Sequence, residues 1–145
     1  MAVAALSTSF LVSYALAAVA GEMRFENVRR QTAEFIGFHK SIRLSAAQQA
    51  IYQEALEALP APCCSDNSAY TCCCPCNAAR AWWGLSKHLI ADLDYDVEQV
   101  KEKVNEWFVF TNPKGYSGDI CYTGGCGRSF ANNGCGGMSE SSLVF

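Results

Sequence analysis

Residues 62–91 of this 145-residue sequence, PCCSDNSAYTCCCPCNAARAWWGLSKHLIA, join a cysteine-rich loop to a segment with helical spacing. Six of the nine cysteines fall within the fourteen residues 63–76. Asn77 is a suitable N-cap for a helix over 78–90. Neighbouring cysteines cannot easily bond to each other, because Cα atoms about 3.8 Å apart lie closer than a disulfide normally requires. Each sulfur of the Cys-rich loop 62–76 therefore needs a more distant partner or a metal ion.

Helical periodicity flanks this loop on both sides. Apolar residues at helical spacing predict a helix from 22 to about 40. Ser45 opens a capping box for a second helix, which Pro60 ends. Residues 96–108 repeat apolar side chains on one face and predict a further helix. The expected fold class is therefore mainly α, a small helical domain over 22–110 that carries the Cys-rich loop.

The C-terminal segment, residues 111–145, lacks this periodicity. Eight of the eleven glycines lie between Gly115 and Gly137, together with three cysteines. Such a segment cannot bury enough apolar surface to offset its ordering entropy. We expect a Gly/Cys-rich irregular segment that packs on the helical domain and is held there by its cysteines.

The first 21 residues contain no charge, and sixteen of them are apolar. Ala18-Val19-Ala20 has the small-x-small pattern of a signal-peptidase site, and an uncleaved apolar helix of this length would also reach across a bilayer core. Residues 1–21 are therefore predicted to be a signal peptide or membrane anchor. Arginines that follow the segment favour a cytoplasmic location by the positive-inside rule, whereas the cysteine usage favours an extracytoplasmic one, membrane-anchored or secreted, which we expect.

The composition excludes several functional classes. Half of the residues are apolar, which rules out long disordered or collagen-like chains. Lys and Arg number 11 against 14 Asp and Glu, so no basic surplus is present and nucleic acid is not an expected partner. The sequence contains no nucleophile–base pair, phosphate-binding loop or paired catalytic carboxylates. We therefore expect a protein that is not an enzyme and that has the membrane, or a membrane protein, as its partner.

Clustered cysteines before a helix favour soft-metal binding, because a helix N-terminus lowers thiol pKa and thiolates are soft ligands. Cu(I) tolerates two or three sulfurs and is the first candidate. Zinc fits less well because the chain has one C-x-x-C pair. An iron–sulfur cluster, which would make the protein an electron carrier, would take three ligands here and one from the C-terminal segment. All nine cysteines are candidate metal ligands: Cys63, Cys64, Cys72, Cys73, Cys74, Cys76, Cys121, Cys126 and Cys135. The leading hypothesis is an extracytoplasmic protein for metal carriage, buffering or delivery.

Two alternatives use the same sulfurs differently. In the first, the cysteines form disulfides that staple the C-terminal segment to the helices, in a structural or accessory subunit of a membrane-associated assembly. That alternative predicts at most one free thiol, whereas the metal hypothesis requires several. In the second, Cys73-Cys74-Pro75-Cys76 resembles the C-x-P-C site of thiol–disulfide oxidoreductases, although no βαβ pattern surrounds it.

The stretch from about Ile51 to Phe108 resembles a known family. It contains Pro62-Cys63-Cys64, the run Cys72-Cys73-Cys74-Pro75-Cys76 and a helix after that run. In these features it is similar to the uncharacterised PCYCGC-motif family of membrane-anchored, Cys-rich bacterial proteins. The resemblance implies an extracytoplasmic, anchored helical module with thiol or metal chemistry.

Overall fold

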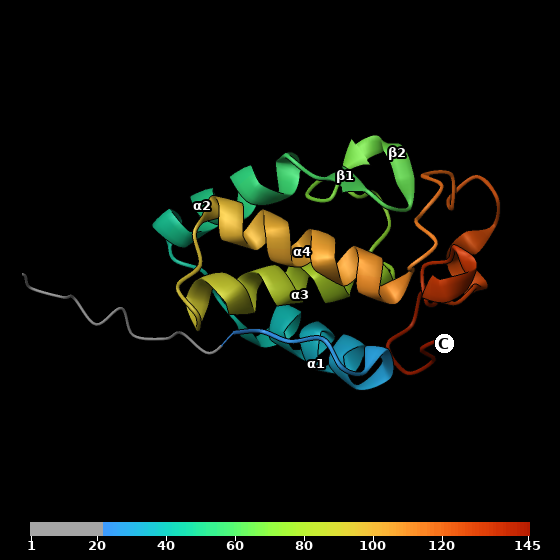
Figure 1. The fold of residues 1–145 in the computed structure, drawn as a ribbon, viewed down its shortest axis with the longest axis horizontal. Helices are drawn as coiled ribbons and strands as arrows, with labels where there is room; N and C mark the ends of the chain where they lie inside the picture. Colours follow the sequence, from blue (N-terminus) through green and yellow to red (C-terminus); the bar gives the residue numbers. More distant parts are fainter. Residues whose placement is uncertain (1–21) are drawn as a thin grey trace, which may run out of the picture.

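The computed structural model describes residues 22–145 and is mainly helical, as the sequence predicts (Figure 1). Its helices are α1 (Val28–Ser41), α2 (Ala46–Glu57), α3 (Asn77–Ala91) and α4 (Val97–Thr111). Among the described residues no helix has the length and apolar character needed to cross a bilayer. The predicted signal peptide or anchor, residues 1–21, lies outside the described residues.

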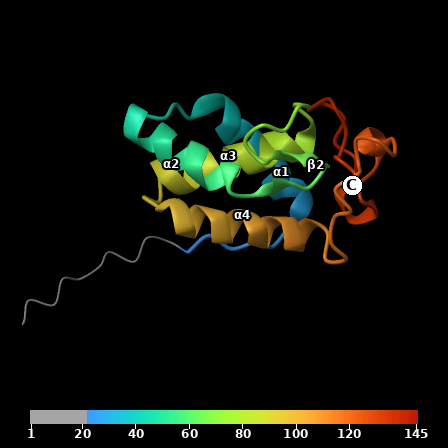
Figure 2. The same ribbon diagram turned by 90° about the horizontal axis from the view of Figure 1, so that it is seen from above.

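Helix α3 is the central element, because it packs against α1, α2 and α4 (Figures 1 and 2). Its closest neighbour is α1, and Gly84 is the residue that permits this approach. A Cβ atom at Gly84 would overlap the backbone carbonyl of Phe35 in α1. Trp82, Leu85 and Leu89 supply the buried face of α3. The Cys-rich loop therefore leads directly into the helix that packs against the other three.

The first helix is shorter than predicted. Residues 22–27 are not helical, and α1 begins at Val28 because the side chain of Asn27 accepts a hydrogen bond from the backbone N–H of Arg30. The expectation of a helix that starts at Glu22 is therefore wrong. Phe25 in this non-helical stretch packs its ring against Trp107 of α4 instead.

Helices α2 and α4 match their predicted positions. Each begins with a capping box, formed by Ser45 with Gln48 in α2 and by Asp96 with Gln99 in α4. The predicted apolar face of α4 is buried at Val100, Val104 and Trp107. Local sequence signals were sufficient for these two helices.

A short antiparallel hairpin, β1 (Pro60–Ala61) with β2 (Cys64–Ser68), forms the first part of the Cys-rich loop. The loop is tied to α3 just after this hairpin, since the indole N–H groups of Trp82 and Trp83 both donate to the carbonyl of Ala69, at 3.0 and 2.8 Å. The sequence analysis expected only a loop here. These bonds hold the second half of the loop, with its cysteines, against the start of α3.

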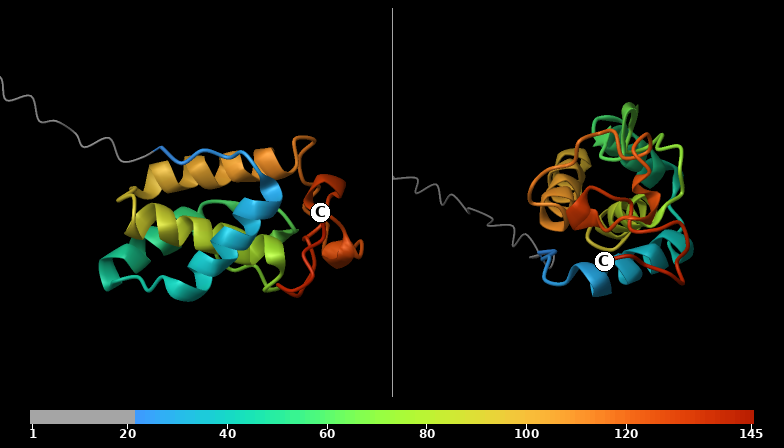
Figure 3. Two further views of the ribbon diagram at one scale, coloured as in Figure 1. Left: turned by 90° about the horizontal axis from the view of Figure 1, so that it is seen from below. Right: turned by 90° about the vertical axis from the view of Figure 1, so that its right-hand side faces the viewer.

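The C-terminal segment covers the end of the bundle that carries the Cys-rich loop (Figure 3). It is irregular apart from two short 3-10 turns, Gly125–Gly127 and Phe130–Asn132. Its backbone pairs with the start of α3, because the N–H of Asn77 donates to Gly137 and the N–H of Ala78 donates to Cys135. The end of the chain is therefore held directly beside the cysteines that precede α3.

The N-cap of α3 is Cys76 rather than Asn77, so the predicted cap is wrong by one residue. The sulfur of Cys76 accepts the N–H of Ala79 at 3.5 Å. Asn77 is fully buried, and its side-chain amide donates to the carbonyls of Gly136 and Ser139, each at 2.9 Å. Asn77 therefore bonds to the C-terminal segment and does not cap the helix.

Candidate metal centre

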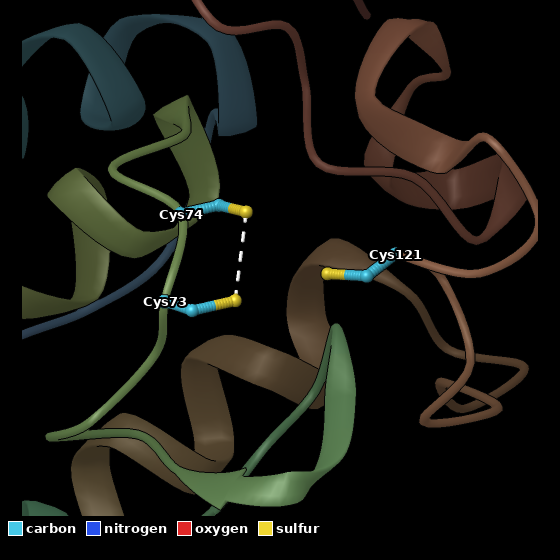
Figure 4. A group of neighbouring side chains, drawn as sticks. All are labelled: Cys73, Cys74 and Cys121. Atoms are coloured by element: carbon cyan, nitrogen blue, oxygen red, sulfur yellow. Dashed lines mark hydrogen bonds between the residues drawn. The ribbon is translucent and has the colours of Figure 1, made fainter.

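Three sulfur atoms meet where the Cys-rich loop faces the C-terminal segment. The Sγ atoms of Cys73, Cys74 and Cys121 all lie within 4.8 Å of one another, and those of Cys73 and Cys74 are 3.6 Å apart (Figure 4). Cys73 is exposed, while Cys74 and Cys121 are half-buried. We call these residues the three-sulfur group. Throughout residues 22–145 no other set of three or more His, Cys, Asp or Glu side chains gathers its ligand atoms this closely.

Backbone hydrogen bonds set the positions of these three residues. The N–H of Cys76 donates to the carbonyl of Cys74 at 2.8 Å, which forms a tight turn immediately before α3. On the other side, the N–H of Cys121 donates to the carbonyl of Cys63 at 3.1 Å and so fastens the C-terminal segment to the loop. Ile120, the neighbour of Cys121, is buried and anchors this contact. The group is thus assembled from segments almost fifty residues apart.

The dimensions of the group suit one metal ion. Metal–thiolate bonds of about 2.3 Å place sulfurs ~4 Å apart around a trigonal or tetrahedral ion. The sulfurs of Cys73 and Cys74 are 3.6 Å apart and no pair in the group is more than 4.8 Å apart, which is close to this separation. The donor set consists only of soft sulfur atoms, which select Cu(I), zinc or iron–sulfur chemistry over hard cations such as magnesium or calcium.

Two thiols of the group, those of Cys74 and Cys121, are held in their protonated form. The pKa of Cys74 is raised to about 12, first by its hydrogen bond with the Cys73 thiol and then by burial. Burial also raises the pKa of Cys121. An incoming metal ion must therefore displace protons from these two sulfurs before it can bind the thiolates.

A second set of cysteines lies deeper, within the core. Cys63, Cys72, Cys76 and Cys135 are all buried. The Sγ atoms of Cys63 and Cys72 are 3.1 Å apart, and the thiol of Cys135 interacts with those of both Cys63 and Cys76. The hydrogen bond with Cys135 is the main reason that the pKa of Cys63 is raised. We call these four residues the buried row.

The last two cysteines belong to neither set. The sulfur of Cys64 accepts a hydrogen bond from Asn67 at 3.3 Å, which is the main reason that its pKa is lowered. Cys126 is half-buried in the first 3-10 turn. Of the nine predicted ligands, the structure therefore brings three together at the surface, aligns four in the core and leaves two outside both sets. All nine carry free thiols in this structure.

The thiol–disulfide exchange alternative gains no geometric support from these contacts. Exchange within a C-x-x-C motif would pair Cys73 with Cys76. Instead, the sulfur of Cys73 contacts that of its neighbour Cys74, and Cys76 is fully buried at the start of α3. The two residues of the motif thus belong to different sets.

Sequence reasoning missed one residue that organises the site. The hydroxyl of Tyr122 donates to the Oδ2 atom of Asp66 at 2.6 Å, which ties the residue after Cys121 to strand β2. Tyr122 is 69% exposed, so its position follows from this contact and not from burial. No local signal predicts a pairing between residues 56 positions apart.

Comparison with known proteins gives no relative for this chain: no family model, no curated protein and no solved structure matches it. The resemblance of residues 51–108 to the PCYCGC-motif family stays a prediction.

Proposed function

We propose that this protein binds a soft metal ion, Cu(I) first, through Cys73, Cys74 and Cys121. It carries, buffers or delivers the ion outside the cytoplasm, attached to the membrane or exported through its N-terminal segment. The observation that supports the proposal is the convergence of three sulfurs from two distant segments at the surface. The location rests on the sequence of residues 1–21 and on the cysteine usage.

The number of ligands favours Cu(I) over the other soft metals. Structural zinc sites use four ligands, and iron–sulfur clusters are usually held by four cysteines. Cu(I) is satisfied by thiolates alone, and a three-sulfur arrangement needs no further protein ligand. The three-sulfur group therefore binds Cu(I) without recruiting a histidine or a carboxylate.

The exposure of the group suits transfer of the ion. Cys73 is open to solvent, so a sulfur ligand of a partner protein can approach the bound metal from that side. Exchange of one thiolate at a time moves the ion without releasing it into water. A carrier or delivery protein needs such an accessible ligand, whereas a purely structural metal site is closed.

The proposal is tested by titrating the reduced full chain with Cu(I) under anaerobic conditions, against a Cu(I) chelator of known affinity. We expect one equivalent to bind with high affinity to the wild type, with a thiolate-to-copper absorption band in the ultraviolet. The triple variant Cys73→Ser/Cys74→Ser/Cys121→Ser is expected to lose this equivalent.

The matched control is Cys64→Ser/Cys126→Ser, which removes the two cysteines outside both sets and is expected to bind like the wild type. Equal binding by the triple variant and the wild type would contradict the proposal. Counting alkylatable thiols in the natively purified protein, before any reduction, separates the structural alternative, which allows at most one.

A further inference from the structure

The buried row differs from the three-sulfur group in its surroundings. Cys63 is 1% exposed, and Cys76 and Cys135 are fully buried. They lie among apolar side chains at the junction of the hairpin, the start of α3 and the C-terminal segment. Such a closed position does not suit an ion that is carried and exchanged, so the four sulfurs need another explanation.

Their spacing does not suit a shared metal ion. With bonds of about 2.3 Å, two sulfurs 3.1 Å apart would subtend an angle of roughly 85° at the metal, well below the tetrahedral or trigonal value. Moreover, no three of the four sulfurs come within 4.8 Å of one another in the described part of the chain. A close contact between two sulfurs, as in Cys63 and Cys72, is the geometry of a disulfide pair and not of a coordination shell.

The backbone independently brings the second pair together. The N–H of Ala78 donates to the carbonyl of Cys135 at 3.0 Å, and the N–H of Asn77 donates to Gly137 at 2.9 Å. The first turn of α3 and residues 135–137 therefore run beside each other. Cys76 directly precedes this turn and Cys135 accepts one of its two bonds, so the two cysteines lie on the two sides of the same contact.

We propose that Cys63–Cys72 and Cys76–Cys135 form two disulfide bonds, separate from the metal centre. This pairing uses every sulfur of the buried row once. The other contact in the row, between Cys63 and Cys135, would leave Cys72 and Cys76 buried without a partner. The adjacent cysteines of the three-sulfur group, Cys73 and Cys74, cannot readily pair with each other and stay free for the metal.

Each bond forms by thiol–disulfide exchange with a disulfide-bearing oxidant, such as oxidised glutathione. The two protein thiols lose two protons and two electrons, and the oxidant takes up both and is reduced to two thiols. Since attack requires an accessible thiolate, the bonds form while the chain folds and before the core closes. Cys63–Cys72 closes the turn around β2, and Cys76–Cys135 fastens the C-terminal segment to α3.

The experiment uses the full chain refolded with a mixture of oxidised and reduced glutathione. Bound metal is removed with a chelator, and free thiols are alkylated under denaturing conditions before digestion. Cleavage after Arg and Lys and before Asp separates peptides 44–65, 66–80 and 129–145, which contain the four residues of the buried row. We expect these three peptides to be joined in one species and five thiols to be alkylated, those of Cys64, Cys73, Cys74, Cys121 and Cys126.

Paired variants assign the two bonds. In Cys63→Ser/Cys72→Ser, peptide 44–65 should be released while 66–80 stays joined to 129–145. In Cys76→Ser/Cys135→Ser, peptide 129–145 should be released instead. Nine alkylated thiols in the wild type would overturn the proposal, as would a bond to the peptide that carries Cys121 and Cys126.

The proposed disulfides and the proposed metal binding can be contradicted independently of each other. Because the peptides are mapped after metal removal, the disulfide result does not depend on copper binding. Mapped bonds in a chain that binds no Cu(I) would overturn the proposed function alone. Cu(I) binding by a chain with nine alkylatable thiols would overturn the disulfides alone.

Discussion

Cys76 and Asn77 are neighbours with different roles, and both depend on the C-terminal segment. Cys76 caps α3 through its sulfur, while Asn77 points away from the helix end to the carbonyls of Gly136 and Ser139. The sequence predicted that Asn77 caps the helix, and the cap is instead the residue before it. The partner of Asn77 could not be predicted, because residues 136–139 are almost sixty positions away.

The substitution Asn77→Ala tests this contact. It removes the two hydrogen bonds that the Asn77 side chain donates to the carbonyls of Gly136 and Ser139, so the free energy of unfolding should fall by about 1–3 kcal/mol. Urea unfolding followed by circular dichroism measures the change. Asn105→Ala, at an exposed position of α4, is the control and should leave the stability nearly unchanged. Equal stability of the two variants would show that the Asn77 contacts do not hold the C-terminal segment.

The raised pKa values of Cys74 and Cys121 predict how metal binding depends on pH. Both thiols are protonated at neutral pH, and Cys74 stays so up to about pH 12. Each proton that the ion displaces makes the apparent Cu(I) affinity rise about tenfold per pH unit. With two such protons, the affinity should rise ~100-fold per unit between pH 6 and 8. Competition titrations across this range measure the slope. An affinity that is independent of pH would mean that the ion does not bind these two sulfurs.

Among the elements, the helices with strong local signals were predicted best. The capping box at Ser45 predicted α2, and regular apolar spacing predicted α4, each to within a few residues. The hairpin and the start of α1 were missed because they rest on distant contacts: the N–H of Ser65 in β2 donates to Gly118, and Phe25 packs on Trp107. Short elements defined by tertiary partners carry little signal in their own sequence.

Substitutions at two glycines test the close packing of α1 on α3. Gly84→Ala places a methyl group on the carbonyl of Phe35, so α1 and α3 must separate and the free energy of unfolding should fall by several kcal/mol. Gly37→Ala is the matched control, since its Cβ meets nothing within 4 Å and Ala raises helix propensity by about 1 kcal/mol. Opposite shifts in the midpoint of denaturant unfolding are expected. A stable Gly84→Ala variant would contradict the close packing of the two helices.

At the scale of the whole molecule, the three-sulfur group brings together two segments that lie far apart in the sequence. Cys73 and Cys74 belong to the loop before α3, and Cys121 belongs to the C-terminal segment (Figure 4). The sequence identified all nine cysteines as candidate ligands but could not sort them. Sorting depends on which sulfurs the fold buries and which it leaves at the surface, and that is decided by contacts such as Tyr122 with Asp66.

A metal ion that joins both segments should stabilise the whole fold. Free Cu(I) at a hundred times its dissociation constant adds about 2.7 kcal/mol, which corresponds to a rise in Tm of roughly 10 °C for a domain of this size. Thermal unfolding with and without Cu(I) measures the shift. Cys121→Ser should lose most of it, whereas Cys64→Ser should keep it. A shift that survives in Cys121→Ser would show that the ion binds within one segment.

The central claim, that one soft metal ion is held by the three-sulfur group, is tested most directly by X-ray absorption spectroscopy of the Cu(I)-loaded full chain. For the wild type we predict three sulfur scatterers at about 2.3 Å, and for Cys121→Ser fewer than three. Nitrogen or oxygen scatterers in the wild type, or an unchanged sulfur count in Cys121→Ser, would contradict the account.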